Sequence, residues 1–441
     1  MLEDIKKLSE FVNGKKVGIL GLGVSNLPLL EILKDFDCEI TVRDKKPVSQ
    51  ELPSCVKVIT GDGYLSDIYE DIVFRSPGIM YSCDEIQSAL KRGTVVTSEM
   101  EMFFELCPCR IIGITGSDGK TTTTTIISEI LKKAGKRVFL GGNIGSPLLP
   151  QIKDMTKDDF CVAELSSFQL MSMKKSPDIA VITNIAPNHL DKHKDMAEYT
   201  EAKTNIFTHG CKKVVLNAEN DITKSFITET SVTFSLKNPQ KNGAYLINGE
   251  IFYNDTFVMN ATDIKIPGIH NVDNFLAAIC AVSGIVDFET VREVARSFGG
   301  VAHRIEFIRE KDGVKYYNDS IASSPTRTIA GLNSFNEKVI LIAGGSDKGI
   351  PFGNLAVKIN EKVKHLVVMG ATKDKIKNAV LAVNADFPIY EAQNLKDAVL
   401  KCHSLSKNGD IVLLSPACAS FDFFKNFEDR GNQFKELVLN L

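Results

Sequence analysis

The residues with the clearest chemical potential form a glycine-rich turn at positions 115–122, which is written Thr-Gly-Ser-Asp-Gly-Lys-Thr-Thr. Glycines allow backbone N–H groups to close around phosphate oxygens, and the start of a following helix adds positive potential. Lys120 can reach the terminal phosphates of a nucleotide, and a threonine hydroxyl can face Mg²⁺. We therefore predict a phosphate-binding loop made of Gly116, Ser117, Asp118, Gly119, Lys120, Thr121 and Thr122.

The segments on either side of this turn are those that a phosphate loop requires. A β-branched run at residues 110–115 predicts a strand, and the residues after the turn predict a helix. The apolar residues on one face of that helix are Ile126, Ile127, Ile130, Leu131 and Ala134. The loop is a variant, because Ile114 stands where the full G-x-x-x-x-G-K-[ST] spacing has its first glycine. The alternative is an ordinary glycine–lysine turn, which leaves both flanking elements unexplained.

Three more residues are candidates for the same site. Glu164 ends the apolar strand at residues 160–164, and the carboxyl ends of parallel strands face one crevice, so its carboxylate could bind a metal there. His189 follows the next apolar strand and could reach a second metal, and Lys203 lies on a predicted helix beside the site. Each has an ordinary alternative, namely a solvated strand-end acid, a structural histidine and an exposed helix lysine.

The elements that must position these residues belong to the α/β class. Short β-branched runs, each followed by a glycine-containing loop and a helical pattern, recur from residues 16–20 to residues 411–416. This alternation is typical of parallel sheets with crossover helices. Two Asn-Gly pairs, at residues 242–243 and 248–249, punctuate short β-like runs and predict hairpins beside the main sheet.

A chain of 441 residues is too long for one ordinary domain. We place one boundary in the Pro108 region and another near Val301. The predicted domains are residues 1–108, residues 109–300, which carry the phosphate loop, and residues 301–441.

A second glycine turn, Gly21-Leu-Gly-Val-Ser-Asn, follows the first predicted strand. It is similar to the dinucleotide-binding fingerprint, but Asn26 occupies the place of the third glycine, which normally permits close helix packing. Asp44, at the end of the second strand, keeps a ribose contact open. The turn therefore suits a nucleotide-like group, and NAD is disfavoured.

Composition narrows the classes of function. Hydrophobic residues make up 44% and charged residues 24% of the chain, which is typical of a globular protein. A formal net charge of −3 offers no general attraction for nucleic acid or an anionic membrane surface. We find no signal peptide and no apolar run near the ~18 residues that cross a bilayer. We therefore expect a cytoplasmic protein whose ten cysteines are reduced.

Taken together, these segments resemble the Mur ligases, which are cytoplasmic enzymes that build the peptide of peptidoglycan precursors. The resemblance covers essentially the whole chain, and residues 414–431 are similar to the subfamily that adds D-glutamate to UDP-N-acetylmuramoyl-L-alanine. The motifs that carry it are Gly116-Ser-Asp-Gly-Lys-Thr-Thr, Glu164-Leu-Ser-Ser-Phe-Gln-Leu, residues 184–191, Gly268-Ile-His-Asn-Val-Asp-Asn, His303-Arg-Ile-Glu and Asn318-Asp-Ser.

The resemblance implies three α/β domains, with Rossmann-like first and third domains and a central P-loop ATPase-like sheet with side hairpins. It implies that the uridine nucleotide of the substrate contacts Gly23, Val24, Ser25, Asp44, Ser76, Pro77, Gly78 and Asn143. It further implies that ATP, besides the phosphate loop, contacts Asn271, Asn274, Arg304 and Asp319, and that D-glutamate contacts Ser323, Lys348, Ser420 and Phe427.

The resemblance also implies a chemistry. One Mg²⁺ would bind Thr121 and Glu164 and a second would bind near His189, while Lys203 matches a lysine that carries a CO₂-derived carbamate. ATP would phosphorylate the substrate carboxylate, and the amine of D-glutamate would displace phosphate from the acyl phosphate. The catalytic residues would be Lys120, His189, Lys203 and Arg304.

Three positions depart from the family pattern. Ile321 stands where many members carry lysine, Ser323 replaces a threonine, and Asn188 replaces an acid before the histidine. Either another cation such as Arg327 replaces the lost lysine or the pocket differs in detail. Two other functions stay open: a carboxylate–amine ligase of the same architecture, such as another Mur step or a folylpolyglutamate synthetase, or a nucleotide-binding regulator that forms no bond. We expect a monomer.

Overall fold

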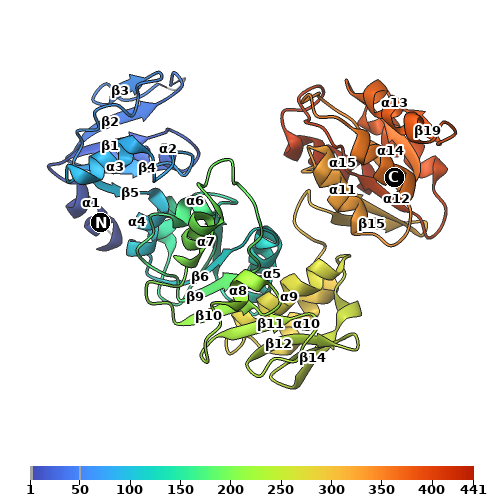
Figure 1. Cartoon of the computed structure of the whole chain (residues 1–441), viewed down its shortest axis with the longest axis horizontal. Coiled ribbons are helices and arrows are strands. Elements are labelled where there is room, and N and C mark those ends of the chain that lie inside the picture. Colours follow the sequence, from blue (N-terminus) through green and yellow to red (C-terminus); the bar gives the residue numbers. More distant parts are fainter. Residues whose placement is uncertain (1–2, 49–50) are drawn as a thin grey trace. The chain divides into compact units, whose positions relative to one another are not determined.

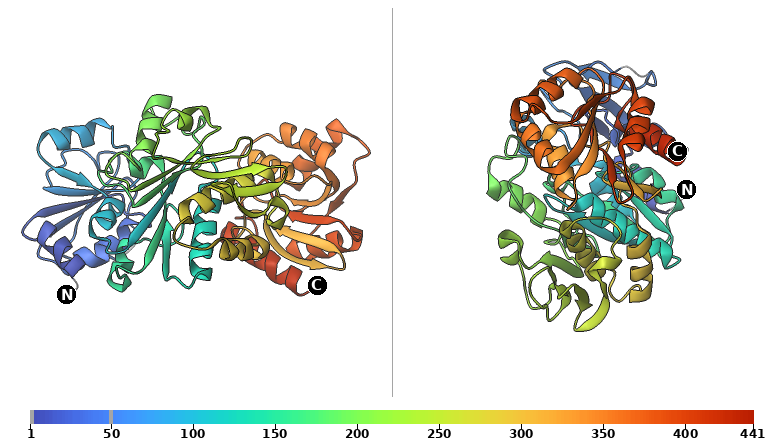
Figure 2. Two further views of the ribbon diagram at one scale, coloured as in Figure 1. Left: turned by 90° about the horizontal axis from the view of Figure 1, so that it is seen from below. Right: turned by 90° about the vertical axis from the view of Figure 1, so that its right-hand side faces the viewer.

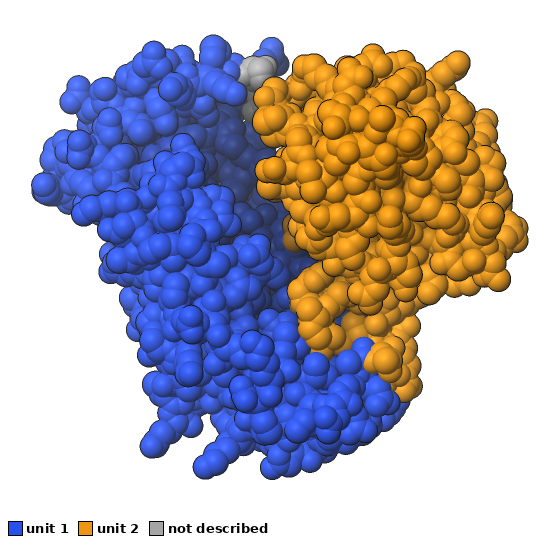
Figure 3. All heavy atoms as spheres, turned by 45° about the vertical axis from the view of Figure 1, so that its right-hand side comes forward, with its two compact units in different colours: residues 1–261, 273–294 blue, residues 262–272, 295–441 orange. Residues whose placement is uncertain are grey.

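The computed structural model describes residues 3–48 and 51–441. Its strands form three sheets, of five, nine and six strands in the described residues, as the α/β prediction required. The chain divides into two compact units (Figure 3). The first unit comprises residues 1–261 and 273–294, and the second comprises residues 262–272 and 295–441. The three predicted domain ranges stay a prediction.

The first sheet is entirely parallel, with the strand order β3-β2-β1-β4-β5 (Figure 1). Its central strand β1 runs next to both β2 and β4, so the turns after these three strands meet at one edge. The strands are β1 (Lys16–Leu20), β2 (Glu39–Asp44), β3 (Lys57–Thr60), β4 (Ile72–Arg75) and β5 (Val95–Thr97). The helices are α1 (Glu3–Val12), α2 (Asn26–Leu33), α3 (Asp84–Lys91) and α4 (Glu99–Leu106).

The second sheet has the order β14-β13-β12-β11-β10-β9-β6-β8-β7, so the strand before the phosphate loop, β6, lies between β9 and β8. The strands are β6 (Arg110–Thr115), β7 (Val138–Gly142), β8 (Phe160–Glu164), β9 (Ile179–Ile182), β10 (Lys213–Asn217), β11 (Val232–Ser235), β12 (Gly243–Ile247), β13 (Glu250–Tyr253) and β14 (Thr256–Asn260). The helices are α5 (Lys120–Lys133), η1 (Leu149–Asp154), α6 (Ser167–Leu170), α7 (Met196–Thr204), α8 (Asp221–Lys224), η2 (Ala261–Asp263), α9 (Ile269–Val282) and α10 (Phe288–Ser297).

One of the two predicted hairpins is confirmed and the other is wrong. The Asn248-Gly249 turn joins the antiparallel strands β12 and β13, but β11 and β12 are parallel, so the Asn242-Gly243 pair makes no hairpin. A Cβ at position 243 would lie 1.7 Å from the Thr233 carbonyl oxygen. This glycine therefore serves the close approach of the two strands. The second hairpin, β13 to β14, turns at Asn254 and Asp255, both with positive φ.

The third sheet has the order β15-β16-β20-β17-β18-β19, with only β15 antiparallel among its described strands. Helices cover both of its faces (Figure 2), because alternate residues of β17 enter two separate cores. The strands are β15 (Glu306–Lys311), β16 (Val314–Asn318), β17 (Val339–Ala343), β18 (Val363–Val368), β19 (Ile389–Glu391) and β20 (Ile411–Leu414). The helices are α11 (Pro325–Asn333), α12 (Gly353–Lys362), α13 (Lys373–Val383), α14 (Leu395–Leu405) and α15 (Phe427–Leu439).

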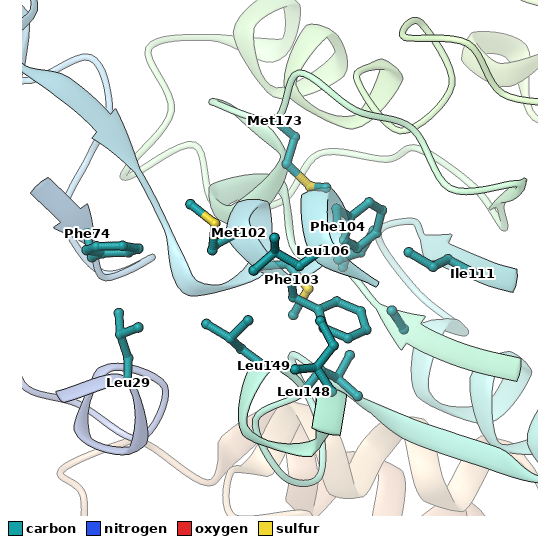
Figure 4. Close-up of a cluster of buried hydrophobic side chains, with 14 of the residues drawn as sticks. Leu29, Phe74, Met102, Phe103, Phe104, Leu106, Ile111, Leu148, Leu149 and Met173 are labelled. Carbon is teal, nitrogen blue, oxygen red and sulfur yellow. The ribbon is translucent and has the colours of Figure 1, made fainter. Parts of the chain in front are cut away.

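A single hydrophobic core joins the first two sheets into one compact unit. Side chains of α4 lie between Phe74 of the first sheet and Ile111 of the second, with Leu148 and Leu149 beside them (Figure 4). Each fully buried leucine or phenylalanine contributes roughly 1.5–3 kcal/mol. The turns after β4 and β6 are therefore held on one body.

Candidate active site

The predicted phosphate loop connects β6 to α5, in the strand–turn–helix context that its sequence requires. Gly116 has φ of +152° and Gly119 has φ of +78°. Residues with side chains rarely adopt such values. A Cβ at position 116 would lie 1.9 Å from Oγ1 of Thr183, and one at position 119 would lie 2.4 Å from Oδ1 of Asn274. Both glycines are therefore needed to keep the loop closed against its neighbours.

The residues that follow β9 hold this loop in place. The Ser117 N–H donates to the Asn184 carbonyl at 2.9 Å, and the Asp118 N–H donates to Asn184 Oδ1 at 3.0 Å. The Thr183 hydroxyl donates to the Asp118 carbonyl at 2.6 Å. Sequence reasoning placed Asn184 in a family motif but missed this supporting role, and it missed Thr183 altogether. Protein groups alone thus fix the shape of the loop.

Lys120 begins α5 and folds back over the loop. Its Nζ donates to the carbonyls of Gly116 and Ser117, at 2.8 and 2.9 Å. These two contacts hold the ammonium at the mouth of the loop. A phosphate oxygen can replace a carbonyl as the acceptor, which is what the sequence prediction requires of this lysine.

Thr121 and Glu164 meet as predicted. The Thr121 hydroxyl donates to Glu164 Oε2 at 2.7 Å, and the side-chain amide of Asn143 donates to Oε1 of the same carboxylate at 2.8 Å. Glu164 is only 1% exposed, so its carboxylate is held by these contacts at the end of β8. A hydroxyl and a carboxylate are hard oxygen ligands that suit Mg²⁺. Asn143 therefore contacts this carboxylate, and its predicted contact with the sugar stays a prediction.

The two oxygens of this pair are a partial metal site. Among the described residues, no group of three or more His, Cys, Asp or Glu side chains is placed to hold a metal ion. Mg²⁺ normally keeps several waters and binds through one or two carboxylates together with substrate phosphates. The pair therefore fits a Mg²⁺ that arrives with a nucleotide.

Lys203 is buried, although an exposed lysine on a helix was the ordinary alternative. Its side chain is 2% exposed, and its Nζ donates to the Gly116 carbonyl at 2.8 Å and lies 4.7 Å from the centre of the Tyr199 ring. Burial, assisted by the charge of Lys120, lowers the pKa of Lys203 to about 7. A large fraction of this amine is therefore neutral near pH 7.

An aromatic cluster connects His189 to the phosphate loop. The exposed His189 packs edge-on against Phe168, with ring centres 5.3 Å apart, and His193 stacks on the same phenyl ring at 5.0 Å. His193 in turn contacts Tyr199, whose hydroxyl is 3.0 Å from the Ser117 hydroxyl. Sequence reasoning missed His193 and Tyr199, because neither stands in a motif whose spacing indicates a site.

His193 is the buried member of the histidine pair. Its Nε2 is 2.9 Å from the Ser167 hydroxyl and its Nδ1 is 3.4 Å from a Glu198 carboxylate oxygen. Burial lowers the pKa of His193, in opposition to Glu198. His189, the predicted metal residue, is exposed and therefore accessible to a ligand. Its φ is positive, which is uncommon outside glycine and indicates a constrained turn.

The first glycine turn differs from a dinucleotide loop for a visible reason. The Asn26 side-chain amide reaches under the turn and donates to the carbonyls of Leu20 and Gly21, at 3.3 and 2.8 Å. Asp44, predicted to contact ribose, accepts the Leu22 N–H at 2.8 Å. The side chain of Asn26 thus occupies the space that a third glycine would leave open.

The residues around the first sheet that are predicted to contact the uridine nucleotide share one edge of that sheet. Gly23 and Val24 are exposed at the turn, and Ser25 is half-buried. The Ser76-Pro77-Gly78 segment follows the neighbouring strand β4, and its Ser76 N–H donates to the Leu20 carbonyl at 2.9 Å. The two loops therefore form one surface at the carboxyl ends of β1 and β4.

In the second unit, Asp319 and its neighbours form a buried polar network. Asp319 accepts a hydrogen bond from the Ser415 hydroxyl at 2.7 Å. Burial raises the pKa of Asp319 to about 7, and the charges of Arg304 and Arg327 act in the opposite direction on that pKa. Asn271, also predicted to contact ATP, donates through its side-chain amide to the Pro267 carbonyl at 2.6 Å.

The family motif around His303 is held together by its own side chains. Asn318 donates to a Glu306 carboxylate oxygen at 3.1 Å and lies 3.1 Å from Nδ1 of His303. The buried Arg430 donates to the Ser320 hydroxyl at 2.9 Å and to the Ser320 carbonyl at 2.8 Å. Arg430 lies in the segment 414–431 that carries the resemblance, but sequence reasoning missed its role, which is to fix the segment that follows Asp319.

Two of the predicted amino-acid-binding residues meet directly. Lys348 Nζ donates to the Ser323 hydroxyl at 3.3 Å, and both side chains are accessible. The loop that carries Lys348 runs beside the segment before Ser420, because the Ser346 N–H donates to the Ala419 carbonyl at 2.9 Å. Ser420 is buried, and Phe427 begins α15 half-buried. Arg327, considered as a replacement for the missing lysine, donates to the Ile321 carbonyl at 3.2 Å.

Comparison with known proteins places these features in a family. Residues 114–282 match the Mur ligase middle domain, and residues 303–418 match the Mur ligase, glutamate ligase domain. The chain belongs to the Mur ligase family. The two matched segments contain the phosphate loop, Glu164, Lys203, Asp319 and Lys348.

Curated relatives match this Mur ligase over its whole length. A protein of Acetivibrio thermocellus named UDP-N-acetylmuramoylalanine--D-glutamate ligase is 50% identical, covering 99% of this chain and 98% of its own. A protein of Clostridium acetobutylicum with the same name is 48% identical, with 100% of both chains covered.

Solved Mur ligase structures share the fold. The UDP-N-acetylmuramate-alanine ligase MurC of Thermotoga maritima superposes with a TM-score of 0.60 at 19% identity, covering 97% of this chain and 99% of that one. The MurF ligase of Thermotoga maritima in complex with ADP gives 0.56 at 17% identity, covering 98% and 97%. No described helix of this Mur ligase is both long enough and apolar enough to cross a membrane.

Proposed function

We propose that this Mur ligase joins D-glutamate to the L-alanyl carboxylate of UDP-N-acetylmuramoyl-L-alanine, with ATP as the phosphoryl donor, in peptidoglycan precursor synthesis. The observation that carries the proposal is the assembly of Lys120, the Thr121–Glu164 pair and Lys203 around one preformed phosphate loop. The names of the relatives that match the whole chain supply the choice of substrates.

The first step uses the phosphate loop. N–H groups of residues 116–122 and the start of α5 hold the triphosphate of ATP, and Lys120 stabilises negative charge on the γ-phosphate. The alanyl carboxylate attacks the γ-phosphorus in line, the bond to the β-phosphate oxygen breaks, and ADP leaves. The product is an acyl phosphate, which turns a poor leaving group into a good one.

The second step forms the amide bond. The neutral amine of D-glutamate attacks the acyl carbonyl carbon, inorganic phosphate leaves, and a proton is lost from the nitrogen. We assign stabilisation of the oxyanion to Lys120 and Arg304, and assistance with the proton to His189. We assign the two carboxylates of D-glutamate to the segment that carries Ser323, Lys348, Ser420 and Phe427, where Lys348 supplies a cation.

Metal binding follows from the same residues. Thr121 and Glu164 would hold one Mg²⁺, and His189 would lie near a second. Bound Mg²⁺ would neutralise charge on the transferred phosphoryl group. The buried amine of Lys203, whose pKa is about 7, would combine with CO₂ to give a carbamate and release a proton. That modification converts a cation, which repels a metal, into an anion that can bind one.

The uridine nucleotide would lie along the edge of the first sheet that Gly23, Val24, Ser25, Asp44, Ser76, Pro77 and Gly78 form, with Asn143 nearby. Asn271, Asn274, Arg304 and Asp319 would complete the ATP site. All proposed residues belong to one chain, so we expect a monomer. We expect it to act in the cytoplasm, where its nucleotide substrates are made.

A substrate panel tests the proposal. Phosphate release is measured with D-glutamate, L-glutamate, meso-diaminopimelate and lysine, each against several UDP-muramyl acceptors. We expect release only with UDP-N-acetylmuramoyl-L-alanine and D-glutamate together. A preference for another pair would assign a different ligase reaction, and ATP binding without release under every pair would indicate a regulator.

A matched pair of variants tests the amino-acid assignment. Lys348→Ala removes one charge-assisted hydrogen bond, so KM for D-glutamate should rise about tenfold to a hundredfold while KM for ATP stays within about threefold. Lys396→Ala, at an exposed lysine of the same unit, is the control. Equal behaviour of the two variants would remove Lys348 from the pocket.

A further inference from the structure

Arg75 is the last residue of β4 and directly precedes the Ser76-Pro77-Gly78 segment. Its side chain is 1% exposed. One end of the guanidinium, Nη1, donates to the Ile79 carbonyl at 2.6 Å. The side chain therefore holds the loop of residues 76–79 from beneath.

The other end of the guanidinium bonds to residues in the part of the first unit that is built around the second sheet. Nη2 donates to the Phe168 carbonyl at 2.8 Å and to the Ser172 hydroxyl at 3.1 Å. The Ser172 hydroxyl in turn donates to Glu101 Oε2 at 3.1 Å. Arg75 thus fastens the loop after β4 to both ends of the short segment that begins with α6.

A second buried arginine of the same sheet shows how unusual this arrangement is. Arg43 pairs directly with Glu70 at 2.8 Å, and its other hydrogen bonds go to carbonyls of Tyr64, Ser66 and Asp67. All of these partners belong to the first sheet's own segments. Arg75 has no carboxylate at ion-pair distance among the described residues, and burial lowers its pKa. The free-energy cost of burying the Arg75 guanidinium is offset by hydrogen bonds that join the parts of the unit around the first and second sheets.

The segment that Arg75 fastens also carries the aromatic cluster of the active site. Phe168 supplies the carbonyl for Arg75, and its ring contacts both His189 and His193. Tyr199 continues this path from His193 to Lys203 and Ser117 of the phosphate loop. A displacement of the Phe168 backbone would therefore shift His189 and the wall behind Lys203.

We propose that Arg75 is a positioning residue that couples the nucleotide loop at residues 76–79 to the His189 and Lys203 side of the phosphate site. The coupling rests on the proposed function, because it takes the uridine nucleotide of the substrate as the ligand of residues 76–78. A planar guanidinium that bonds on both sides transmits a shift of the loop to Phe168 as a rigid fork, which a lysine ammonium cannot do.

The kinetic test uses Arg75→Met, Arg75→Lys and Ser172→Ala. Arg75→Met should lower kcat by about 30-fold and raise KM for UDP-N-acetylmuramoyl-L-alanine by about tenfold, since small misplacements at a reacting centre cost this much. KM for ATP should stay within about threefold. Arg75→Lys should recover little. Ser172→Ala should show a smaller loss, and the double variant should cost no more than Arg75→Met alone, because both residues lie on one path.

The control separates positioning from simple attachment of the two sheets. Glu99 accepts the Leu149 N–H at 2.8 Å, and this bond also joins α4 to the part of the unit around the second sheet. Among the described residues, Glu99 makes no hydrogen bond to residues 76–79 or to α6. Glu99→Ala should lower Tm and leave kcat unchanged. An equal loss of kcat in Glu99→Ala and Arg75→Met, at equal loss of Tm, would overturn the proposal. Partial recovery of Arg75→Ala by low millimolar guanidinium would support it.

Hydrogen exchange provides a readout that needs no turnover. In the wild-type protein, UDP-N-acetylmuramoyl-L-alanine should slow amide hydrogen exchange at residues 167–172. The Arg75→Met variant should still bind this ligand but show no slower exchange there. Binding without slower exchange in the wild-type protein would refute the coupling alone. If the wild-type protein binds the ligand and shows slower exchange but forms no amide bond, the proposed reaction alone is refuted. If it does not bind the ligand, the coupling and the proposed reaction are both refuted.

Discussion

Two glycine turns of this chain stand at equivalent places in their sheets and differ in what lies beneath them. Both follow a central parallel strand and lead into a helix, one at residues 21–25 and the other at residues 116–119. Under the first, the Asn26 amide fills the space and donates to the carbonyls of Leu20, which ends the strand, and Gly21, which begins the turn. Under the second, Thr183 and Asn184 hold the loop from the segment that follows the neighbouring strand β9.

The difference shows that glycine spacing alone does not define a phosphate site. The second turn adds Lys120 at the start of a helix of 14 residues and, at its side, the Thr121–Glu164 pair that we propose for Mg²⁺. The first opens into a helix of 8 residues and has Val24 at its tip, 78% exposed. The first turn can therefore offer a surface to a nucleotide, while the second can enclose a triphosphate.

The largest expected effect is the loss of Lys120. Lys120→Ala should reduce ligation by about 10³-fold or more with an unchanged fold, because the lysine supplies charge where the transition state needs it. Phosphate release and circular dichroism measure the two quantities. Lys132→Ala is the control on the same helix, since Lys132 pairs with Glu129 in an exposed contact. Near-normal turnover of Lys120→Ala would remove the distinction between the two turns.

Lys203→Ala should lose about 10²-fold in activity, through loss of the proposed carbamate. Millimolar short-chain carboxylic acids should restore part of it, because they can replace the missing carboxylate in the space that the side chain leaves. A steady-state assay with increasing acetate measures the recovery. Lys203→Arg, which fills the space with a fixed cation, should not respond. An unmodified amine at Lys203 in a high-resolution structure of the liganded enzyme would contradict the carbamate.

Paired alanine substitutions compare the two turns directly. Gly116→Ala would place a Cβ against Thr183, so it should destabilise the loop and lower ATP-dependent activity by about tenfold or more. In contrast, a Cβ at Gly23 meets no atom within 4 Å. The Tm of Gly23→Ala should therefore change by less than about 2 °C. Thermal unfolding and ATP titration measure both variants. If Gly116→Ala binds ATP normally, the closed form of the loop is not required.

Much of this contrast could be predicted from the sequence, and part of it could not. Local patterns predicted the strand, turn and helix around Lys120 and placed Glu164 at a strand end beside it. They could not predict that Asn26 would fill the first turn, or that Tyr199 would lie against Lys203 with His193 packed on Tyr199, because these contacts depend on how distant segments pack. The same reason explains the wrong hairpin at Asn242, where strand pairing with β11 decided the outcome.

The buried amine of Lys203 should also affect stability. Its folded pKa of about 7 lies below the ordinary value of 10.5, so between these values the unfolded chain holds a proton that the folded chain lacks. The free energy of unfolding should therefore rise with pH over this window. Lys203→Met should be more stable than the wild-type protein near pH 7 in CO₂-free buffer, and the difference should vanish near pH 10.5. Chemical denaturation at several pH values measures it.

The smallest expected effect concerns the first turn. Asn26→Gly restores the third glycine of the dinucleotide fingerprint but removes the amide that donates to the Gly21 carbonyl, while the Leu20 carbonyl keeps the Ser76 N–H, so it should cost about 1–3 kcal/mol of stability. It should not create an NAD site with useful affinity. Urea unfolding and NAD titration measure the two outcomes, and a stable variant that binds NAD would show that Asn26 alone separates the two turns.

The central claim is that the loop at residues 116–122 binds a triphosphate, and direct titration tests it best. A non-hydrolysable ATP analogue with Mg²⁺ should bind the wild-type protein at one site, with a Kd in the range of about 1 µM to 1 mM that is usual for enzyme substrates. Lys120→Ala should weaken that binding, and Asn26→Gly should leave it unchanged. No saturable binding to the folded wild-type protein at millimolar concentrations would contradict the account.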